Sequence, residues 1–206
     1  MENKTVEKII QTAIDMIAGN GYHNTSIKSI TSKLGITQPA IYAHFENKAE
    51  IAIRIAKMYE SGYIENLIRI VNDPSDSALD KLHKVISWGA EFVIKHPNLI
   101  IAYIALKNEL KEEPIFHKLS TGIEDRYVKT ITKLYRLGLR QGHFNNTFNV
   151  KVLTHVHIAT TVGMFYEWRN NGGRLNGEEF IRTFRTIIFK GIEASGGSVR
   201  AGRSRR

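Results

Sequence analysis

Apolar residues recur at helical spacing along almost the whole chain. The first clear run holds Val6, Ile9, Ile10, Ala13, Ile14 and Ile17, spaced three or four residues apart. The sequence Gly19-Asn20-Gly21 ends this run, so the pattern predicts a first helix over residues 3–18. Strand-type alternation is nearly absent. The chain is therefore predicted to be all-α.

Two short helices are predicted next. Thr25 or Ser26 is placed to cap a second helix, which ends at Gly35 because glycine tolerates a left-handed conformation. Thr37 is placed to cap a third helix. Pro39 then falls in the first turn of that helix, where its missing N–H does no harm.

The remaining helices are longer. Asn47 followed by Glu50 resembles a capping box for a fourth helix that runs to about residue 71. Five further helices are expected over about residues 77–95, 97–111, 114–142, 149–170 and 177–194. The predicted domains are residues 1–50, 51–194 and a disordered basic tail, 195–206. The tail is a dangling segment, an arm that contacts phosphate, or a remnant of expression.

Composition excludes several classes of protein. The chain has no cysteine, which rules out disulfides, thiolate zinc sites and cysteine nucleophiles. Its first residues do not resemble a signal peptide, and the most apolar stretch, residues 99–106, is too short to cross a bilayer. We therefore expect a cytoplasmic protein.

The net charge of +9 suggests a nucleic-acid partner, but it does not locate a site. Residues 1–50 hold as many acids as lysines, and the last twelve residues hold arginines and no acid. The placement of individual side chains must therefore identify the binding surface.

The two short helices joined by Gly35-Ile36 form a candidate helix-turn-helix. On a helical wheel Ile41 and Phe45 share one face, and Pro39 and Ala43 lie roughly opposite. The apolar pair would anchor the third helix, while the small residues let its other face approach DNA closely.

The candidate DNA contacts divide into two kinds. Gln38 would hydrogen-bond a base edge, and Pro39 and Ala40 would contact a thymine methyl group. The other candidates would contact phosphates or flank the reading face: Thr25, Lys28, Thr37, Tyr42, His44 and Lys48.

The first quarter of the chain resembles the DNA-binding domain of TetR-family transcriptional regulators, over residues 6 to about 53. The shared features are the Gly21-Tyr22 pair, the Leu34-Gly35-Ile36 turn, the Ile41-Tyr42 step and the Phe45-x2-Lys48 ending. The resemblance implies DNA contacts by Lys28, Gln38, Pro39, Tyr42, His44 and Lys48. It also implies a C-terminal half that binds a small effector and forms a homodimer.

Within this family, a ligand that prefers one dimer shape changes the separation of the two DNA-binding modules. The resemblance therefore implies a repressor that binds a palindromic operator and is released by an effector. The helix at residues 47–71 would carry the change. No metal or other cofactor is expected.

The last two helices would pair with their copies in a four-helix bundle. Their apolar and small residues form two stripes: Val152, Val156, Ala159, Thr160 and Gly163, and Phe180, Phe184, Ile187, Ile188 and Gly191. Packing within one chain is the alternative explanation for these stripes.

An effector pocket is expected where aromatic side chains gather with a few polar groups. The candidates are Trp88, Phe92, Tyr103, Tyr127, His155, Phe165 and Trp168, and they suggest a hydrophobic or aromatic ligand. An ordinary core position is the alternative explanation for each of them, and it is the commoner one for a single aromatic residue. His155 and His157 point about 200° apart on a helix, so they cannot chelate one ion together.

Two other functions stay open from the residues alone. An enzyme is disfavoured because no hydrolase elbow, P-loop, dinucleotide glycine pattern or zinc-protease motif is present. The carboxylates Glu109, Glu112 and Glu113 are expected to be a solvated helix end. An architectural DNA-binding protein without a ligand is the second alternative.

Overall fold

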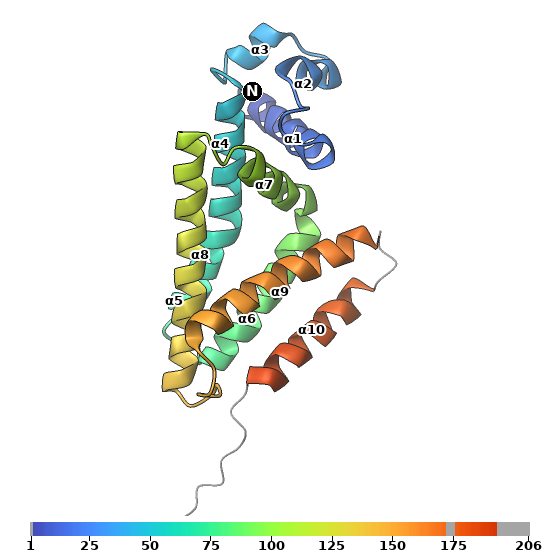
Figure 1. Cartoon of the computed structure of the whole chain (residues 1–206). Helices are drawn as coiled ribbons and strands as arrows, with labels where there is room; N and C mark the ends of the chain where they lie inside the picture. The colour runs from blue at the N-terminus through green and yellow to red at the C-terminus, as the bar shows by residue number, and fades with distance from the viewer. Residues whose placement is uncertain (1, 172–175, 193–206) are drawn as a thin grey trace, which may run out of the picture. The chain divides into compact units, whose positions relative to one another are not determined.

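The computed structural model describes residues 2–171 and 176–192, and it confirms the all-α prediction (Figure 1). The described residues contain no extended strand. The helices are α1 Glu2–Asn20, α2 Ile27–Leu34, α3 Gln38–Tyr42, α4 Lys48–Tyr59, η1 Glu60–Ile64, α5 Glu65–Asn72, α6 Ala78–Lys95, α7 Pro97–Glu109, α8 Pro114–Arg140, α9 Val150–Asn170 and α10 Gly177–Ile192. The predicted tail, 195–206, lies outside the described residues.

The chain forms two compact units. The first comprises the residues up to Ile70 together with Ser87–Lys129, and the second comprises Val71–Ile86 together with the residues from Thr130 onward. Helices α1 to α4, η1 and α7 belong to the first unit, whereas α9 and α10 belong to the second. The predicted boundary near residue 50 falls inside the first unit, so the proposed domain division stays a prediction.

The core of the first unit is built around α1. This helix packs against α2, α4 and α7, and α2 packs against α3. Five isoleucines of α1 and α2 fill this core and are almost fully inaccessible to solvent: Ile9, Ile10, Ile14, Ile17 and Ile30. Burial of such branched side chains is the main stabilising term for so short a set of helices. We call α1 to α3 the head.

Local capping defines the helices of the head. The hydroxyl of Ser26 accepts a hydrogen bond from Ser29 N at 3.0 Å, so Ser26, not Thr25, caps α2. Gly35 adopts φ 67° and ends α2, as predicted. Thr37 occupies the N-cap position of α3 but its side chain makes no capping hydrogen bond.

The predicted fourth helix is interrupted by a π-helical segment. Asn47 Oδ1 accepts a hydrogen bond from Glu50 N, which confirms Asn47 as the cap of α4, whereas the Glu50 carboxylate accepts from Glu46 N. The chain then widens to π geometry over η1 before it returns to α geometry in α5. Segments of this kind are rare and often occur at functional sites. The apolar pattern alone predicted one uninterrupted helix.

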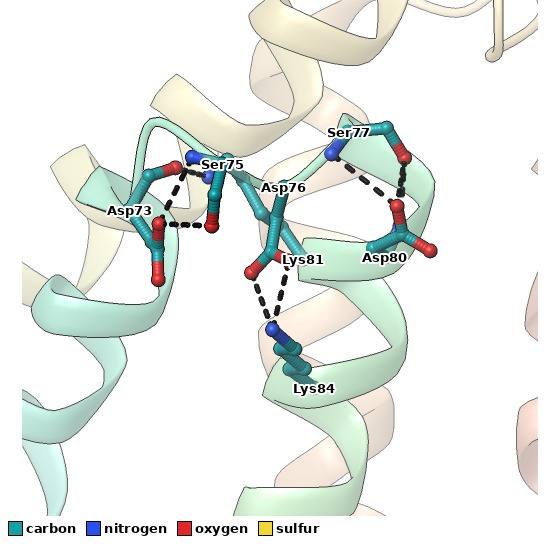
Figure 2. A network of polar contacts seen from close by, with 7 residues as sticks. All are labelled: Asp73, Ser75, Asp76, Ser77, Asp80, Lys81 and Lys84. Atoms are coloured by element: carbon teal, nitrogen blue, oxygen red, sulfur yellow. Dashed lines mark hydrogen bonds and ion pairs between the residues drawn. The ribbon is translucent and has the colours of Figure 1, made fainter.

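The turn before α6 is fixed by short polar contacts (Figure 2). Asp73 Oδ1 accepts hydrogen bonds from the backbone N–H and the hydroxyl of Ser75. The hydroxyl of Ser77 donates to the Asp80 carboxylate at 2.6 Å and accepts from Asp80 N at 3.2 Å, and the second of these bonds caps the start of α6. Lys84 pairs with Asp76 at 2.6 Å. Asp73, Asp76 and Asp80 are therefore part of the turn and of the cap of α6.

The second unit has a core with buried polar contacts. Tyr135 Oη and His157 Nδ1 share a hydrogen bond of 2.8 Å between α8 and α9. Burial lowers the pKa of His157 to about 4, so this imidazole is neutral at pH 7. The His83 ring stacks on Phe189 of α10 with centroids 3.7 Å apart.

Two kinds of site are absent from the part of the chain that the structure describes. No group of three His, Asp or Glu side chains there could hold a metal ion. None of the helices described there has both the length and the apolarity that a bilayer span requires.

Candidate functional site

Helix α3 presents one face to solvent because its other face is anchored. Ile41 is fully buried and Phe45 is 4% exposed, as the helical wheel predicted. Gln38 and Pro39 are exposed, and Tyr42 is 51% exposed. The exposed face thus carries a bifunctional amide, a rigid apolar ring and a phenol, which suit base-edge, methyl and phosphate contacts respectively.

The remaining candidates around α3 are also accessible to different degrees. Thr37 and Lys28 are exposed, whereas Ala40 and His44 are partly exposed. His44 lines a shallow groove of about 190 Å³ together with Phe45 and residues of α4. All four side chains stay candidates for DNA contact.

Thr25 does not support the role predicted for it. Its side chain is fully buried, and its hydroxyl donates to the carbonyl oxygen of Gly21 at 2.8 Å. A hydroxyl that is buried and already bonded cannot reach a phosphate. Thr25 therefore holds the turn between α1 and α2, and we do not retain it as a DNA contact.

Lys48 is engaged with the same turn. Its ammonium group donates to the carbonyl oxygens of Tyr22 and Thr25 at 3.0 and 2.9 Å. It also lies 3.9 Å from the centroid of the Tyr22 ring, a cation–π distance. Burial lowers the pKa of Lys48, partly offset by the charge of Glu109. The lysine predicted to contact phosphate thus fastens α4 to the turn.

The carboxylate of Glu109 was missed as a structural residue. It was predicted to be solvated, but Oε1 accepts from Tyr22 N at 3.0 Å and Oε2 accepts from His23 N at 2.8 Å. Gly21 lies beside it at φ 82°, and a Cβ there would stand 2.7 Å from Glu109 Oε1. No local sequence signal could reveal these contacts, because they join residues more than 80 positions apart.

Residues 21–25, which we call the head turn, are therefore held from two sides. The last residue of α7 supplies an anion that accepts from backbone N–H groups. The first residue of α4 supplies a cation that donates to backbone carbonyl groups. Charge-assisted hydrogen bonds of this kind are about twice as strong as neutral ones.

Four of the predicted effector residues belong to the first unit. Trp88 and Phe92 have ring centroids 5.7 Å apart, and Phe92 lies 5.2 Å from Tyr63. Tyr63 in turn lies 5.9 Å from Tyr127. Tyr59 continues the series at 5.4 Å from Tyr63, and it stacks on Tyr103 at 4.2 Å. We call these six rings the aromatic run.

The sequence did not predict a role for Tyr59 or Tyr63. Tyr59 directly precedes the π-helical segment η1, and Tyr63 lies within it. Two glycines keep space for the neighbouring rings. A Cβ on Gly62 would stand 3.1 Å from Phe92, and one on Gly89 would stand 3.3 Å from the Tyr63 hydroxyl. The π geometry and the glycines together allow this close aromatic packing.

Two polar atoms in the aromatic run are buried without a hydrogen-bond partner among the described residues: Trp88 Nε1 and Tyr103 Oη. Burial raises the pKa of Tyr103 strongly, so its hydroxyl remains a donor at pH 7. A buried donor without an acceptor is costly, by about 1–3 kcal/mol. Such atoms are candidates for contact with a ligand.

The charged groups close to the aromatic run are paired. Glu60 forms an ion pair with Arg126, and Glu124 forms one with Lys107. These carboxylates are neutralised by a partner in the same unit. The site therefore offers hydrogen-bond donors rather than a net charge.

The other three predicted effector residues belong to the second unit. Phe165 is buried, Trp168 is partly exposed and His155 is exposed. His155 shares no metal cluster with His157, whose ring is bonded to Tyr135.

The predicted dimer stripe of α9 lies on the surface of the second unit. All five of its residues are exposed: Val152, Val156, Ala159, Thr160 and Gly163. On α10, Ile187 is 64% exposed, whereas Phe180, Phe184 and Ile188 are partly exposed. Exposed apolar residues in such a row are typical of an interface.

Comparisons with known proteins identify both halves of the chain. A sequence profile described as "Bacterial regulatory proteins, tetR family" matches residues 9–55. A second profile, "Tetracyclin repressor-like, C-terminal domain", matches residues 75–192. Together the two profiles cover the head and most of the remaining helices.

Similar proteins are transcriptional regulators. The fatty acid metabolism regulator protein of Bacillus subtilis is 24% identical over 186 residues, which is 90% of this chain and 94% of that protein. The negative regulator IcaR of the biofilm operon icaADBC in Staphylococcus epidermidis is 24% identical over 128 residues, 60% of this chain and 67% of that protein.

Solved structures share the fold. The ketosteroid regulator KstR2 of Mycobacterium tuberculosis superimposes with a TM-score of 0.80 at 21% identity, covering 93% of this chain and 96% of that one. The MbdR regulator of Azoarcus gives 0.81 at 22% identity, covering 91% and 98%. With the helix-turn-helix geometry and the two matching profiles, these likenesses establish that the chain belongs to the TetR family of bacterial transcriptional regulators.

Proposed function

We propose that the protein is a cytoplasmic repressor that binds a palindromic operator as a homodimer and is released by a small apolar effector. The observation that carries the DNA-binding part is the anchoring of α3 through buried Ile41 and Phe45. This anchoring leaves Gln38, Pro39 and Tyr42 on an accessible face. Lys28, Thr37, Ala40 and His44 complete the proposed contact surface, and Lys48 supports it through the head turn.

Homodimer formation is supported by the exposed stripe on α9 and by Ile187 on α10. A two-fold dimer presents two copies of α3, which suits two half-sites about one or more turns of DNA apart. Two linked modules also bind more tightly than one.

The effector is proposed to bind at the aromatic run, through Trp88, Phe92, Tyr103 and Tyr127. The rings favour a hydrophobic or aromatic compound, and the two unpartnered donors favour one that carries a hydrogen-bond acceptor such as a carbonyl oxygen. Relatives named for fatty acid metabolism and for ketosteroid regulation are consistent with an apolar effector. His155, Phe165 and Trp168, in the second unit, stay candidates for effector contact.

The DNA-binding proposal is tested by selecting duplexes from a random pool with the purified protein. We expect the selected duplexes to share a palindromic consensus. At fixed salt the protein should bind this consensus at least about 1,000 times more tightly than it binds unrelated duplex. Equal binding to all duplexes would instead identify an architectural DNA-binding protein and would exclude specific repression.

A further inference from the structure

Helix α7 contacts two separate parts of the first unit that have different proposed roles. Tyr103, near its middle, lies in the aromatic run, and Glu109, its last residue, holds the head turn. We infer that Glu109 is a positioning residue for DNA recognition, which fixes the orientation of the head through α7. The inference rests on the proposed function, because it concerns how the same head meets its operator.

The contacts of Glu109 are suited to fix the position of the head turn. Its two carboxylate oxygens accept from the N–H groups of two consecutive residues, Tyr22 and His23, so both the distance and the tilt of the turn are constrained. These N–H groups lie just before α2, whose N-cap is Ser26. A change in the position of Glu109 would therefore move the start of α2.

The head turn cannot easily adapt to a displaced Glu109. Gly21 is in the left-handed region at φ 82°, and the space where a side chain would begin is occupied by the Glu109 carboxylate. Thr25, at the other end of the turn, is fully buried and bonded to Gly21. The head turn is thus stiff, and its position follows the positions of Glu109 and Lys48.

Helix α7 can transmit a displacement because it is packed along its length. Ala102 and Leu106 are fully buried, and the helix packs against both α1 and α4. Tyr103 and Glu109 are six residues apart, which is about 9 Å along a helix axis. A shift of α7 at the aromatic run would therefore reach the head turn directly, in parallel with any movement of α4 that acts through Lys48.

The inference is tested with Glu109→Gln and Glu109→Asp, with Glu112→Gln as the matched control. The Glu112 side chain is 89% exposed and belongs to the same acidic segment. Glu109→Gln removes the charge, and Glu109→Asp keeps the charge but shortens its reach. The thermal unfolding of each variant is recorded first, and Glu109→Asp serves if Glu109→Gln does not fold.

The first measurement is backbone amide exchange in the free protein. We expect exchange at Tyr22 and His23 to rise by about tenfold or more in the Glu109 variants and to stay at the wild-type rate in Glu112→Gln. Wild-type exchange at both amides in a folded Glu109 variant would overturn the inference. This measurement does not involve DNA, so it decides the role of Glu109 even if the proposed function is wrong.

The second measurement uses a set of operators whose half-site separation differs by single base pairs. A poorly oriented head should lose the preference for one separation, so the ratio between the best and the next separation should fall by about tenfold in Glu109→Gln. A purely destabilising change would lower binding to every separation by one common factor. That outcome, with an unchanged ratio, would also overturn the inference.

Discussion

The ammonium group of Lys48 lies over the ring of Tyr22 while it donates a hydrogen bond to the carbonyl oxygen of the same residue. One side chain therefore contacts both the backbone and the ring of a residue 26 positions earlier. This relationship joins the first turn of α4 to the turn that precedes the DNA-binding helices. It assigns a structural role to a lysine whose position alone suggested a phosphate contact.

Replacement of Lys48 by Met should weaken the head more than it changes the charge at the DNA surface. The variant loses two hydrogen bonds and a cation–π contact, so we expect a loss of about 1–2 kcal/mol in the free energy of unfolding. Chemical denaturation measures this loss. The slope of log operator affinity against log salt concentration distinguishes a phosphate contact from a structural role. Loss of a phosphate contact would reduce the size of this slope by about 0.9 per protomer.

Replacement of Gln38 by Ala should relax the preference at one base pair in each half-site. The amide is exposed on α3 and can both donate to and accept from a base edge, so its loss should remove about 1–3 kcal/mol of discrimination there. Binding to a panel of single-base operator variants at fixed salt provides the measurement. Tyr42→Ala is the comparison, because loss of a phosphate contact should weaken binding to all sequences alike. A uniform loss for Gln38→Ala would refute its role in reading a base.

Replacement of Ile187 by Asp should convert the protein to a monomer. Ile187 is 64% exposed on α10, and a carboxylate at this apolar surface would have to lose its hydration in a dimer. Molar mass by light scattering is the measurement. Ile115→Asp is the matched control, since Ile115 is 74% exposed on α8 but lies in the first unit. A dimeric Ile187→Asp protein would place the interface elsewhere.

Replacement of Tyr103 by Phe should stabilise the ligand-free protein, which is unusual for a tyrosine that is 5% exposed. The change removes a hydroxyl that is buried without a partner among the described residues and keeps the stacked ring, so a gain of about 1 kcal/mol is expected. Thermal unfolding of the two proteins tests this. The same variant should bind a neutral aromatic ketone such as benzophenone less tightly than wild type does. Unchanged stability and unchanged affinity together would exclude the hydroxyl as a ligand contact.

The stability of the second unit should fall as the pH decreases through the range from about 6.5 to 4. Burial lowers the pKa of His157 to about 4 in the folded protein, so the unfolded chain binds a proton first as the pH falls. The expected slope is about 1.4 kcal/mol per pH unit within this range, and there is no contribution above it. Denaturation at pH 7 and pH 5 should show a smaller difference for His157→Gln than for wild type. Equal differences between pH 7 and pH 5 in the two proteins would mean that other titrating groups dominate the pH dependence of stability.

The parts of the structure that sequence predicted well depend on local chemistry. The cap at Asn47, the stop at Gly35 and the buried face of Ile41 and Phe45 each involve residues only a few positions apart. Their geometry follows from helical spacing and backbone preference. The exposed face of α3 could therefore be predicted from the residues alone.

The parts that sequence missed depend on contacts between distant residues. Glu109 was expected to be solvated because it stands in a charged segment, and only folding brings it to Tyr22 and His23. Thr25 was expected to be accessible, but it is buried. Its burial depends on how α1 packs against α2, and the local sequence does not show this. The π-helical segment was missed because one additional residue per turn hardly changes an apolar pattern over so short a stretch.

The π-helical segment Glu60–Ile64 has a practical consequence for building chimeras. Fusing this head to the C-terminal domain of a related regulator requires a junction within the segment formed by α4, η1 and α5. Each residue there turns the helix by about 100°. A join that aligns the two sequences but omits the additional residue would rotate everything after it by that angle. Donor and recipient should therefore be matched for the presence of this wide turn before the crossover point is chosen.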